Sequence, residues 1–339
     1  MSADRRVGRL AAWRWELALV AVTAVWGATF VVVRDAVARV PPSAFIAMRF
    51  LAAAALLASL RPRQALRPDL GLAAAGGLAG LALFAGYAFQ TVGLQYTSAS
   101  SAGFITGLAV VLTPLLGALV LRQRPGRWPA TGALLAAAGL ALLTLRRLEV
   151  HRGDLLVLGC AFAFASHILL LGRFSPRHAS YQLAVVQLAT TGVLALAWAG
   201  GAGELRPPGS AQVWFALAVT AVLASAGSFL IQTRAQRDVS PTRTAVIFTM
   251  EPVFAAAFAF WLAGERLGAR GWLGAACIVA GMLVAELGRP GEVPVAAPGE
   301  YPLRADGAEE AGRKPITYPR CAPSPACRRA GEEGRATDT

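Results

Sequence analysis

The chain has 339 residues, of which 56% are apolar and 15% are charged, and its mean hydropathy is +0.53. Soluble domains carry roughly 25% charged residues, so this composition excludes a water-soluble globular protein. The net charge of +13 does not indicate a nucleic-acid partner, because the arginines stand in short clusters between apolar stretches.

Hydropathy predicts ten transmembrane helices. About 20 apolar residues cross a bilayer core roughly 30 Å thick, and windows of that length place the spans at 17–36, 43–60, 71–93, 100–121, 128–146, 153–172, 181–200, 211–233, 242–263 and 271–288. Gly, Pro and Arg mark the joints, and every connection is short. The sequence therefore predicts an all-α integral membrane protein without an inserted soluble domain.

The positions of the arginines predict the orientation of these spans. If the N-terminal segment 1–16 is cytoplasmic, the cytoplasmic side before the tail has 15 of them: Arg5, Arg6, Arg9, Arg14, Arg61, Arg63, Arg67, Arg122, Arg124, Arg127, Arg173, Arg177, Arg234, Arg237 and Arg243. The opposite side then has eight: Arg34, Arg39, Arg146, Arg147, Arg152, Arg206, Arg266 and Arg270. This bias predicts a multi-pass protein of the cell (plasma) membrane with both termini in the cytoplasm.

The last part of the chain, residues 289–339, changes character. Pro, Gly, Glu and Arg dominate it, and no apolar periodicity is present. Such a composition cannot bury enough apolar surface to offset the entropy lost on ordering. We therefore expect a disordered cytoplasmic tail.

The two halves of the membrane part resemble one another. A shift of 142 residues aligns Gln90-Thr91 with Gln232-Thr233, Ser98 with Ser240, Arg124 with Arg266, Gly126 with Gly268, Gly132-Ala133 with Gly274-Ala275 and Ala138-Gly139 with Ala280-Gly281. The repeats would cover residues 17–146 and 153–288. Because five spans is an odd number, the second repeat must be inverted in the membrane. Inverted repeats are typical of secondary transporters, whose substrate site lies between the repeats near the midplane.

Several short motifs occur in an order that is similar to one known family. They are Trp26-Gly27-Ala28-Thr29-Phe30, Ala47-Met48-Arg49-Phe50, the run from Tyr96 to Phe104 (YTSASSAGF), Glu251-Pro252-Val253-Phe254 and Gly264-Glu265-Arg266-Leu267, followed by Gly274 and Gly281. With these motifs the chain resembles the EamA-type transporters of the drug/metabolite transporter superfamily over roughly residues 15–288. The resemblance implies ten helices in two inverted five-helix repeats that move metabolites, amino acids or drugs, often outward.

The sequence departs from an exact duplication at two places. The first repeat has Gln123 where the second has Glu265, so this acidic position is not shared. Pro114 and Pro252 are out of register by four residues under the shift of 142, so the spans that contain them need not bend alike.

Glu251 is the strongest candidate for a functional residue. It lies within an apolar span, where an ionised carboxylate costs several kcal/mol, so it must face a cavity, pair with a charge or take up a proton. The following Pro252 lacks a backbone donor and leaves a carbonyl one turn back without its partner. Glu251 can therefore belong to a substrate or proton site, or it can pair or pack at a helix kink.

Arg49 is the natural partner, because it interrupts the otherwise uncharged span 43–60. A guanidinium at that depth needs a carboxylate, backbone carbonyls or an anionic substrate, unless it snorkels to the interface. Tyr87 and Gln90 are three residues apart and share a helix face. With Trp26 they could line a substrate cavity, and interhelical polar packing is the alternative for each.

His167 has no second histidine or carboxylate at ligand spacing nearby, which favours a hydrogen-bonded core histidine over a proton relay. The chain has no Gly-x-Ser-x-Gly, no His-Glu-x-x-His and no Asp-rich pair, so we expect no enzyme, no catalytic residue, no metal and no cofactor.

We therefore expect a secondary transporter, an exporter working by alternating access, whose partners are a small-molecule substrate and the lipid bilayer. Proton coupling would follow if Glu251 is a protonation switch. A passive channel or a non-transporting membrane scaffold is the alternative that the sequence leaves open, and the oligomeric state is open too.

Overall fold

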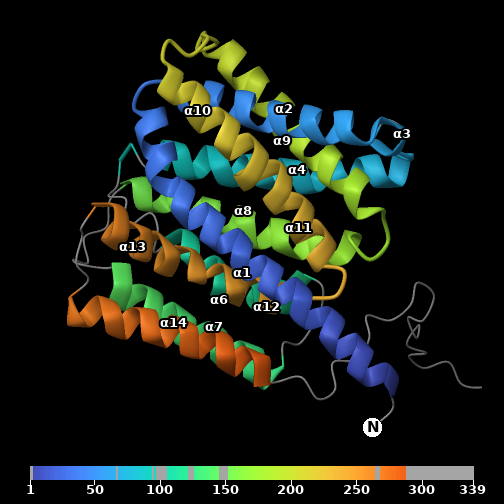
Figure 1. The fold of residues 1–339 in the computed structure, drawn as a ribbon, viewed down its shortest axis with the longest axis vertical. Coiled ribbons are helices and arrows are strands. Elements are labelled where there is room, and N and C mark those ends of the chain that lie inside the picture. The colour runs from blue at the N-terminus through green and yellow to red at the C-terminus, as the bar shows by residue number, and fades with distance from the viewer. Residues whose placement is uncertain are drawn as a thin grey trace, which may run out of the picture. The chain divides into compact units, whose positions relative to one another are not determined.

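The computed structural model describes residues 3–65, 68–93, 95–96, 105–120, 126–144, 152–263 and 268–287. Throughout these ranges the regular secondary structure is helical (Figure 1). The described helices belong to one compact unit, Met1–Gly291. The tail predicted at 289–339, the motif residues 97–104, Gln123 and Glu265 lie outside the described residues.

The helices follow one another along the chain with short connections. In the first half they are α1 (Ala3–Val37), α2 (Pro42–Leu60), α3 (Pro62–Ala65), α4 (Leu70–Gly93), α6 (Ala109–Val120) and α7 (Arg127–Thr144). In the second half they are α8 (Arg152–Phe174), α9 (Ser180–Gly201), α10 (Ala211–Val219), η1 (Thr220–Gly227), α11 (Ser228–Ala235), α12 (Pro241–Phe248), α13 (Met250–Ala263) and α14 (Ala269–Leu287).

Five of the described helical stretches are long and apolar enough to cross a membrane: Pro42–Leu60, Leu70–Gly93, Arg152–Phe174, Ser180–Gly201 and Ala211–Ala235. Shorter apolar helices cover Ile105–Val120 and Ala269–Ala285. These seven coincide with predicted spans, so the prediction of an all-helical protein with membrane-spanning helices is confirmed. The count of ten spans stays a prediction.

The predicted span 242–263 is divided into two helices. α12 ends before Thr249, and both the backbone N–H and the hydroxyl of Thr249 donate to the carbonyl oxygen of Val246, at 3.1 and 2.6 Å. Pro252 lies one turn further on and has no N–H to continue the ladder. The break therefore lies next to Glu251, which becomes part of the first turn of α13.

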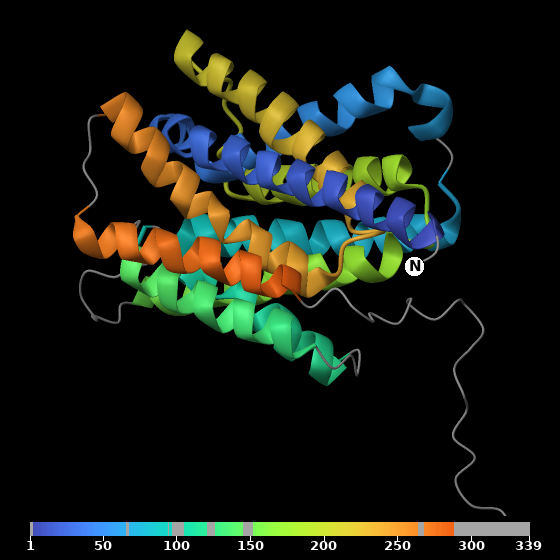
Figure 2. The same cartoon turned by 60° about the horizontal axis from the view of Figure 1, so that its bottom comes forward.

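Helices α7 and α14, the last of each half, pack along each other, as Figures 1 and 2 show in green and orange. A Cβ atom on Gly132 would lie 2.5 Å from the carbonyl oxygen of Gly281, and one on Gly139 would lie 2.6 Å from that of Gly274. The earlier glycine of each pair, Gly132 or Gly274, thus meets the later glycine of the other helix. The two helices are antiparallel, and only residues without a side chain fit at these crossings.

Other helix pairs also repeat between the halves. α4 packs on α8 and α9, while α11 packs on α1 and η1 packs on α2. In the same way α6 packs on α8, and α13 packs on α1. The counterparts five spans apart are α1 and α8, α2 and α9, α4 and the segment η1–α11, and α6 and α13. When each helix is replaced by its counterpart, the α4–α8 contact becomes the α11–α1 contact, and the α4–α9 contact becomes the η1–α2 contact. The α6–α8 contact becomes the α13–α1 contact.

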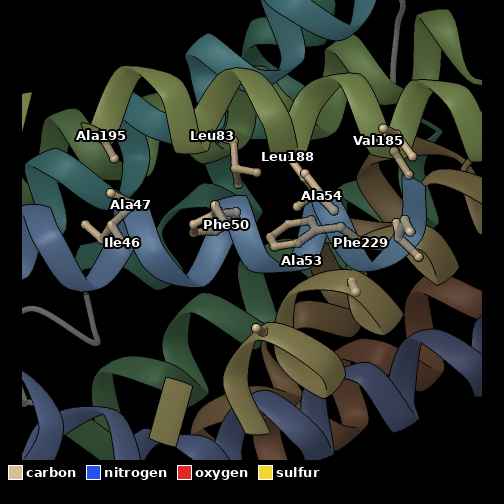
Figure 3. Packing of buried hydrophobic residues seen from close by; sticks show 14 of the residues in the cluster. Ile46, Ala47, Phe50, Ala53, Ala54, Leu83, Val185, Leu188, Ala195 and Phe229 are labelled. Atoms are coloured by element: carbon tan, nitrogen blue, oxygen red, sulfur yellow. The ribbon is translucent and has the colours of Figure 1, made fainter. Parts of the chain in front are cut away.

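The largest cluster of buried apolar side chains joins both halves. Figure 3 shows Phe50 and its neighbours on α2 against Leu83 of α4, Leu188 of α9 and Phe229 of α11. Phe50 and Leu188 are fully buried. Trp26 and Tyr87 pack at the margin of this cluster, which brings two of the predicted site residues to the contact between the halves.

Candidate functional site

Arg49 lies near the middle of α2 and is buried, with 6% of its surface exposed. Its Nε donates to the Ser225 hydroxyl at 2.6 Å, and its Nη2 reaches the Ala224 carbonyl oxygen at 3.4 Å and the Tyr87 hydroxyl at 3.5 Å. These partners come from η1 and α4. The side chain is therefore held inside the protein, and the snorkelling alternative is wrong.

Aromatic rings surround this guanidinium. The Arg49 Cζ atom lies 5.2 Å from the ring centre of Phe50 and 5.3 Å from that of Tyr87, which allows cation–π attraction. Tyr87 also meets Phe50 and Phe164 edge to face, with centroids 5.0 and 5.5 Å apart. Trp26 meets Phe248 and Phe229 at 5.0 and 5.7 Å. We call these six side chains the aromatic cluster: Trp26, Phe50, Tyr87, Phe164, Phe229 and Phe248.

The π-helical segment η1 binds both Arg49 and Trp26 through one carbonyl group. The indole N–H of Trp26 donates to the Ala224 carbonyl oxygen at 2.9 Å, and Arg49 Nη2 reaches the same oxygen. π-Helical turns are rare and occur mainly at functional sites. Neither Ser225 nor the carbonyl of Ala224 was found from the sequence, because one serine in an apolar helix carries no distinctive signal.

Glu251, in the first turn of α13, is half-buried and interacts electrostatically with Arg49 and Tyr87. The two charged side chains do not form a direct ion pair, and no described residue hydrogen-bonds the carboxylate. The positive end of the α13 dipole favours a negative charge at this position.

Gly27 brings α1 against this turn of α13. A Cβ atom there would lie 2.8 Å from the Ala255 nitrogen and 3.0 Å from the carbonyl oxygen of Glu251. The glycine next to Trp26 therefore lets the backbones of α1 and α13 touch. Trp26 and Glu251 come from opposite halves of the chain and are brought close in this way.

The structure brings four of the five predicted site residues together. Arg49 contacts Tyr87 directly, shares the Ala224 carbonyl with Trp26 and interacts with Glu251. Gln90 is the exception, because its amide donates to the Thr106 hydroxyl at 3.3 Å, beside Cys160. It lies one helical turn away from Tyr87, in a polar contact between helices.

A second buried polar group also contacts Phe229. His167 Nε2 donates to the Gln187 amide oxygen at 2.8 Å, and the Gln187 amide nitrogen donates to the Thr233 hydroxyl at 2.8 Å. Gln187 and Thr233 are fully buried, and the His167 ring meets Phe229 edge to face at 5.9 Å. The prediction of a hydrogen-bonded core histidine is confirmed.

Local hydrogen bonds reproduce the alignment of the two halves. The Thr91 hydroxyl donates to the carbonyl oxygen of Tyr87 at 2.7 Å, and the Thr233 hydroxyl donates to that of Phe229 at 2.6 Å. The shift of 142 residues relates both pairs. Tyr87 and Phe229 are thus counterparts, and both pack against Phe50.

Arg243, predicted among the cytoplasmic arginines between the spans, is buried in the structure. Its Nη1 lies 4.0 Å from a carboxylate oxygen of Glu16, and the exposed fractions of the two side chains are 8% and 7%. This contact joins the start of α12 to α1. Among the described residues, no group of three or more His, Cys, Asp or Glu side chains could hold a metal ion.

Comparison with known proteins agrees with this arrangement. The model of the EamA-like transporter family matches twice, over residues 13–145 and 151–286. The chain belongs to the EamA-like transporter family. Its two matched segments are the two EamA-like repeats expected from the internal alignment.

Two relatives and one solved structure give the extent of the similarity. An uncharacterized transporter of Archaeoglobus fulgidus is 30% identical over 272 residues, which is 80% of this chain and 85% of that protein. The uncharacterized transporter YyaM of Bacillus subtilis is 26% identical over 276 residues, 76% of this chain and 89% of that protein. A crystal structure of a protein with 19% identity has a TM-score of 0.67 and covers 79% of this chain and 95% of that one. This EamA-family chain is therefore a membrane transporter.

Proposed function

We propose that this protein is a secondary transporter that exports a small metabolite, amino acid or drug by alternating access. The observation that carries the proposal is the group formed by Arg49, Tyr87, Trp26 and Glu251 at the contact between the two halves. In a transporter built from repeats, the substrate site lies at such a contact.

The proposal includes ten spans in two inverted repeats, 17–146 and 153–288, in the plasma membrane with both termini inside. The antiparallel packing of α7 on α14 supports it, because these helices occupy the same place in the two halves. Counterpart helices of inverted repeats run in opposite directions through the bilayer, and the antiparallel α7 and α14 are such a pair in this proposal.

The chemistry of the site favours a substrate with a carboxylate, an amine and an apolar or aromatic body. Arg49 can bind a carboxylate through its guanidinium, and Glu251 has acceptor oxygens for an ammonium group. The aromatic cluster offers ring faces and edges for the remainder. An aromatic amino acid in its zwitterionic form has these three features.

Proton coupling would use Glu251. A carboxylate that no described residue hydrogen-bonds is the group most easily neutralised by a proton when no substrate is bound. A proton and a substrate would then compete for Glu251, so that proton entry drives substrate exit. This competition makes net transport depend on the proton gradient.

The test is counterflow in proteoliposomes with three probes that share a phenyl ring: L-phenylalanine, 3-phenylpropanoate and phenethylamine. We expect saturable exchange of L-phenylalanine. Arg49→Ala should raise the half-saturation concentration of the two carboxylate probes about 10- to 100-fold, because hydrogen bonds to a charged group are lost. Arg61→Ala is the matched control, because Arg61 is exposed at the end of the same helix.

Glu251→Gln separates coupling from binding. Exchange of L-phenylalanine should persist at a higher half-saturation concentration, because glutamine keeps an acceptor oxygen but not the negative charge, while accumulation driven by a pH gradient should fall to the level of protein-free liposomes. Flux that does not saturate would identify a passive channel, and no flux with any amino acid or cationic drug in a resistance screen would identify a scaffold. Unchanged gradient-driven transport in Glu251→Gln would reject proton coupling through this residue.

A further inference from the structure

The turn of η1 next to Arg49 has hydrogen bonds that a regular α-helix would not have. In an α-helix the Ser228 N–H would donate to the carbonyl of Ala224, four residues earlier. Here it donates to the carbonyl oxygens of Leu223 and Ser225, and the Ser228 hydroxyl also donates to Leu223, at 2.8 Å. The Ala224 carbonyl is thereby released from Ser228, and it accepts from Trp26 and Arg49 instead.

These contacts occupy one edge of the Arg49 guanidinium. Nε and Nη2 lie on the same edge, where Ser225, Ala224 and Tyr87 accept their hydrogens. No described residue accepts from Nη1. Both hydrogens of Nη1 are thus the part of Arg49 that remains for the carboxylate of a substrate.

We infer that η1 is the positioning element of the Arg49 site and that Ser225 is a positioning residue that turns the guanidinium toward the carboxylate of the substrate. This inference rests on the proposed function, which supplies that substrate. Ser225 is fully buried and accepts the shortest of the Arg49 hydrogen bonds. A planar guanidinium held by hydrogen bonds at Nε and Nη2 cannot turn about the Cδ–Nε bond, so the direction of Nη1 is fixed as well.

Loss of the Ser225 hydroxyl should affect only the probes that have a carboxylate. In Ser225→Ala, half-saturation for L-phenylalanine and 3-phenylpropanoate should rise about tenfold, because a hydrogen bond to a charged group is lost. Phenethylamine, which has no carboxylate, should be unaffected. Ser225→Thr keeps the hydroxyl and should restore the carboxylate probes. An equal loss of all three probes in Ser225→Ala, or no change in any, overturns the inference.

A measurement without substrate keeps this result separate from the proposed function. In detergent-solubilised protein labelled with 15N-arginine, the Arg49 Nε–H signal, assigned by its loss in Arg49→Lys, should exchange slowly with water. It should stay protected in Ser225→Thr and become rapidly exchanging in Ser225→Ala. If wild type transports none of the probes, the proposed substrate class fails. If the Nε–H is unprotected in wild type, or equally protected in Ser225→Ala, the positioning role fails.

Discussion

Two buried polar groups contact Phe229, one through Trp26 and one through His167, and they differ in which of their side chains have hydrogen-bond partners. The Arg49 region comprises Arg49, Tyr87, Trp26, Ser225 and Glu251, and the His167 region comprises His167, Gln187 and Thr233. In the His167 region each side chain has a partner within 2.8 Å. In the Arg49 region no described residue bonds Nη1 or the Glu251 carboxylate.

This difference suggests different roles: the His167 region holds helices together, and the Arg49 region binds the substrate in the proposed mechanism. The hydrogen-bond chain of the His167 region fixes α8, α9 and α11 against one another. A region with spare donors and acceptors can change its partners at low cost when a substrate or proton arrives. Burial of polar groups alone would not have distinguished the two regions.

The largest loss of stability is expected when the hydrogen-bond chain of the His167 region is broken. Gln187→Leu leaves the His167 N–H without its acceptor in a fully buried place, and the free energy of unfolding should fall by about 1–3 kcal/mol. Half-saturation for L-phenylalanine, measured on the protein that remains folded, should stay within a factor of two. Thermal unfolding in detergent and counterflow measure the two quantities.

Arg49→Ala should change the two quantities the other way round. Half-saturation for L-phenylalanine should rise strongly, while the free energy of unfolding should change little. Removal of a buried charge also removes its desolvation cost, so stability need not suffer. If Gln187→Leu abolished transport at unchanged stability, the roles of the two regions would be reversed.

The Gly27→Ala variant tests whether substrate binding in the Arg49 region requires the close contact between α1 and α13. Gly27→Ala forces a methyl group to within 2.8 Å of the Ala255 nitrogen. Overpacking of this kind costs about 1–3 kcal/mol, and here it also moves Trp26 relative to Glu251. We expect a lower midpoint of thermal unfolding together with weaker binding of L-phenylalanine.

Gly77→Ala is the matched control, since nothing lies within 4 Å of a Cβ at that position of α4. It should leave both measurements unchanged. If the two alanine variants had the same unfolding midpoint and the same half-saturation, the close contact between α1 and α13 would contribute neither to stability nor to binding.

The smallest change in stability is expected for Thr233 and Thr91, the two threonines that correspond under the shift of 142 residues. Thr233→Val removes the acceptor of the Gln187 amide and should lower the unfolding free energy by about 1 kcal/mol. Thr91→Val removes a hydroxyl bonded to its own helix, so the loss should be a few tenths of a kcal/mol. Equal losses would indicate that the Gln187–Thr233 bond adds nothing.

Sequence alone predicted the class of fold and most of the site, because both depend on strong local signals. Charged residues are costly in apolar spans and therefore rare there, so Arg49 and Glu251 stand out from their neighbours in the chain. Glycines at the same places in both halves predicted a repeat, and they lie at the α7–α14 crossings.

The features that were missed depend on tertiary contacts. Nothing in the residues of Thr220–Gly227 distinguishes a π-helix from an α-helix. The wide turn leaves the Ala224 carbonyl free to accept from Trp26 and Arg49, and these two residues lie far away in the sequence. The break at Thr249 could be foreseen only in part, because Pro252 predicts a weakened turn but not where the chain stops being helical. Arg243 was taken for a topology signal, since its burial against Glu16 requires the start of α12 to meet the interior of α1, far away in the sequence.

The central claim is that the Arg49 region lies between two halves that cross the membrane in opposite directions. The most direct measurement uses single cysteines at Tyr96 and Asp238, two exposed positions that follow counterpart helices, in a chain whose four native cysteines are replaced. With a membrane-impermeant maleimide added to intact cells, Tyr96→Cys should be labelled and Asp238→Cys should be protected until the membrane is opened. Labelling of both positions from the same side would contradict the inverted arrangement and the alternating-access mechanism derived from it.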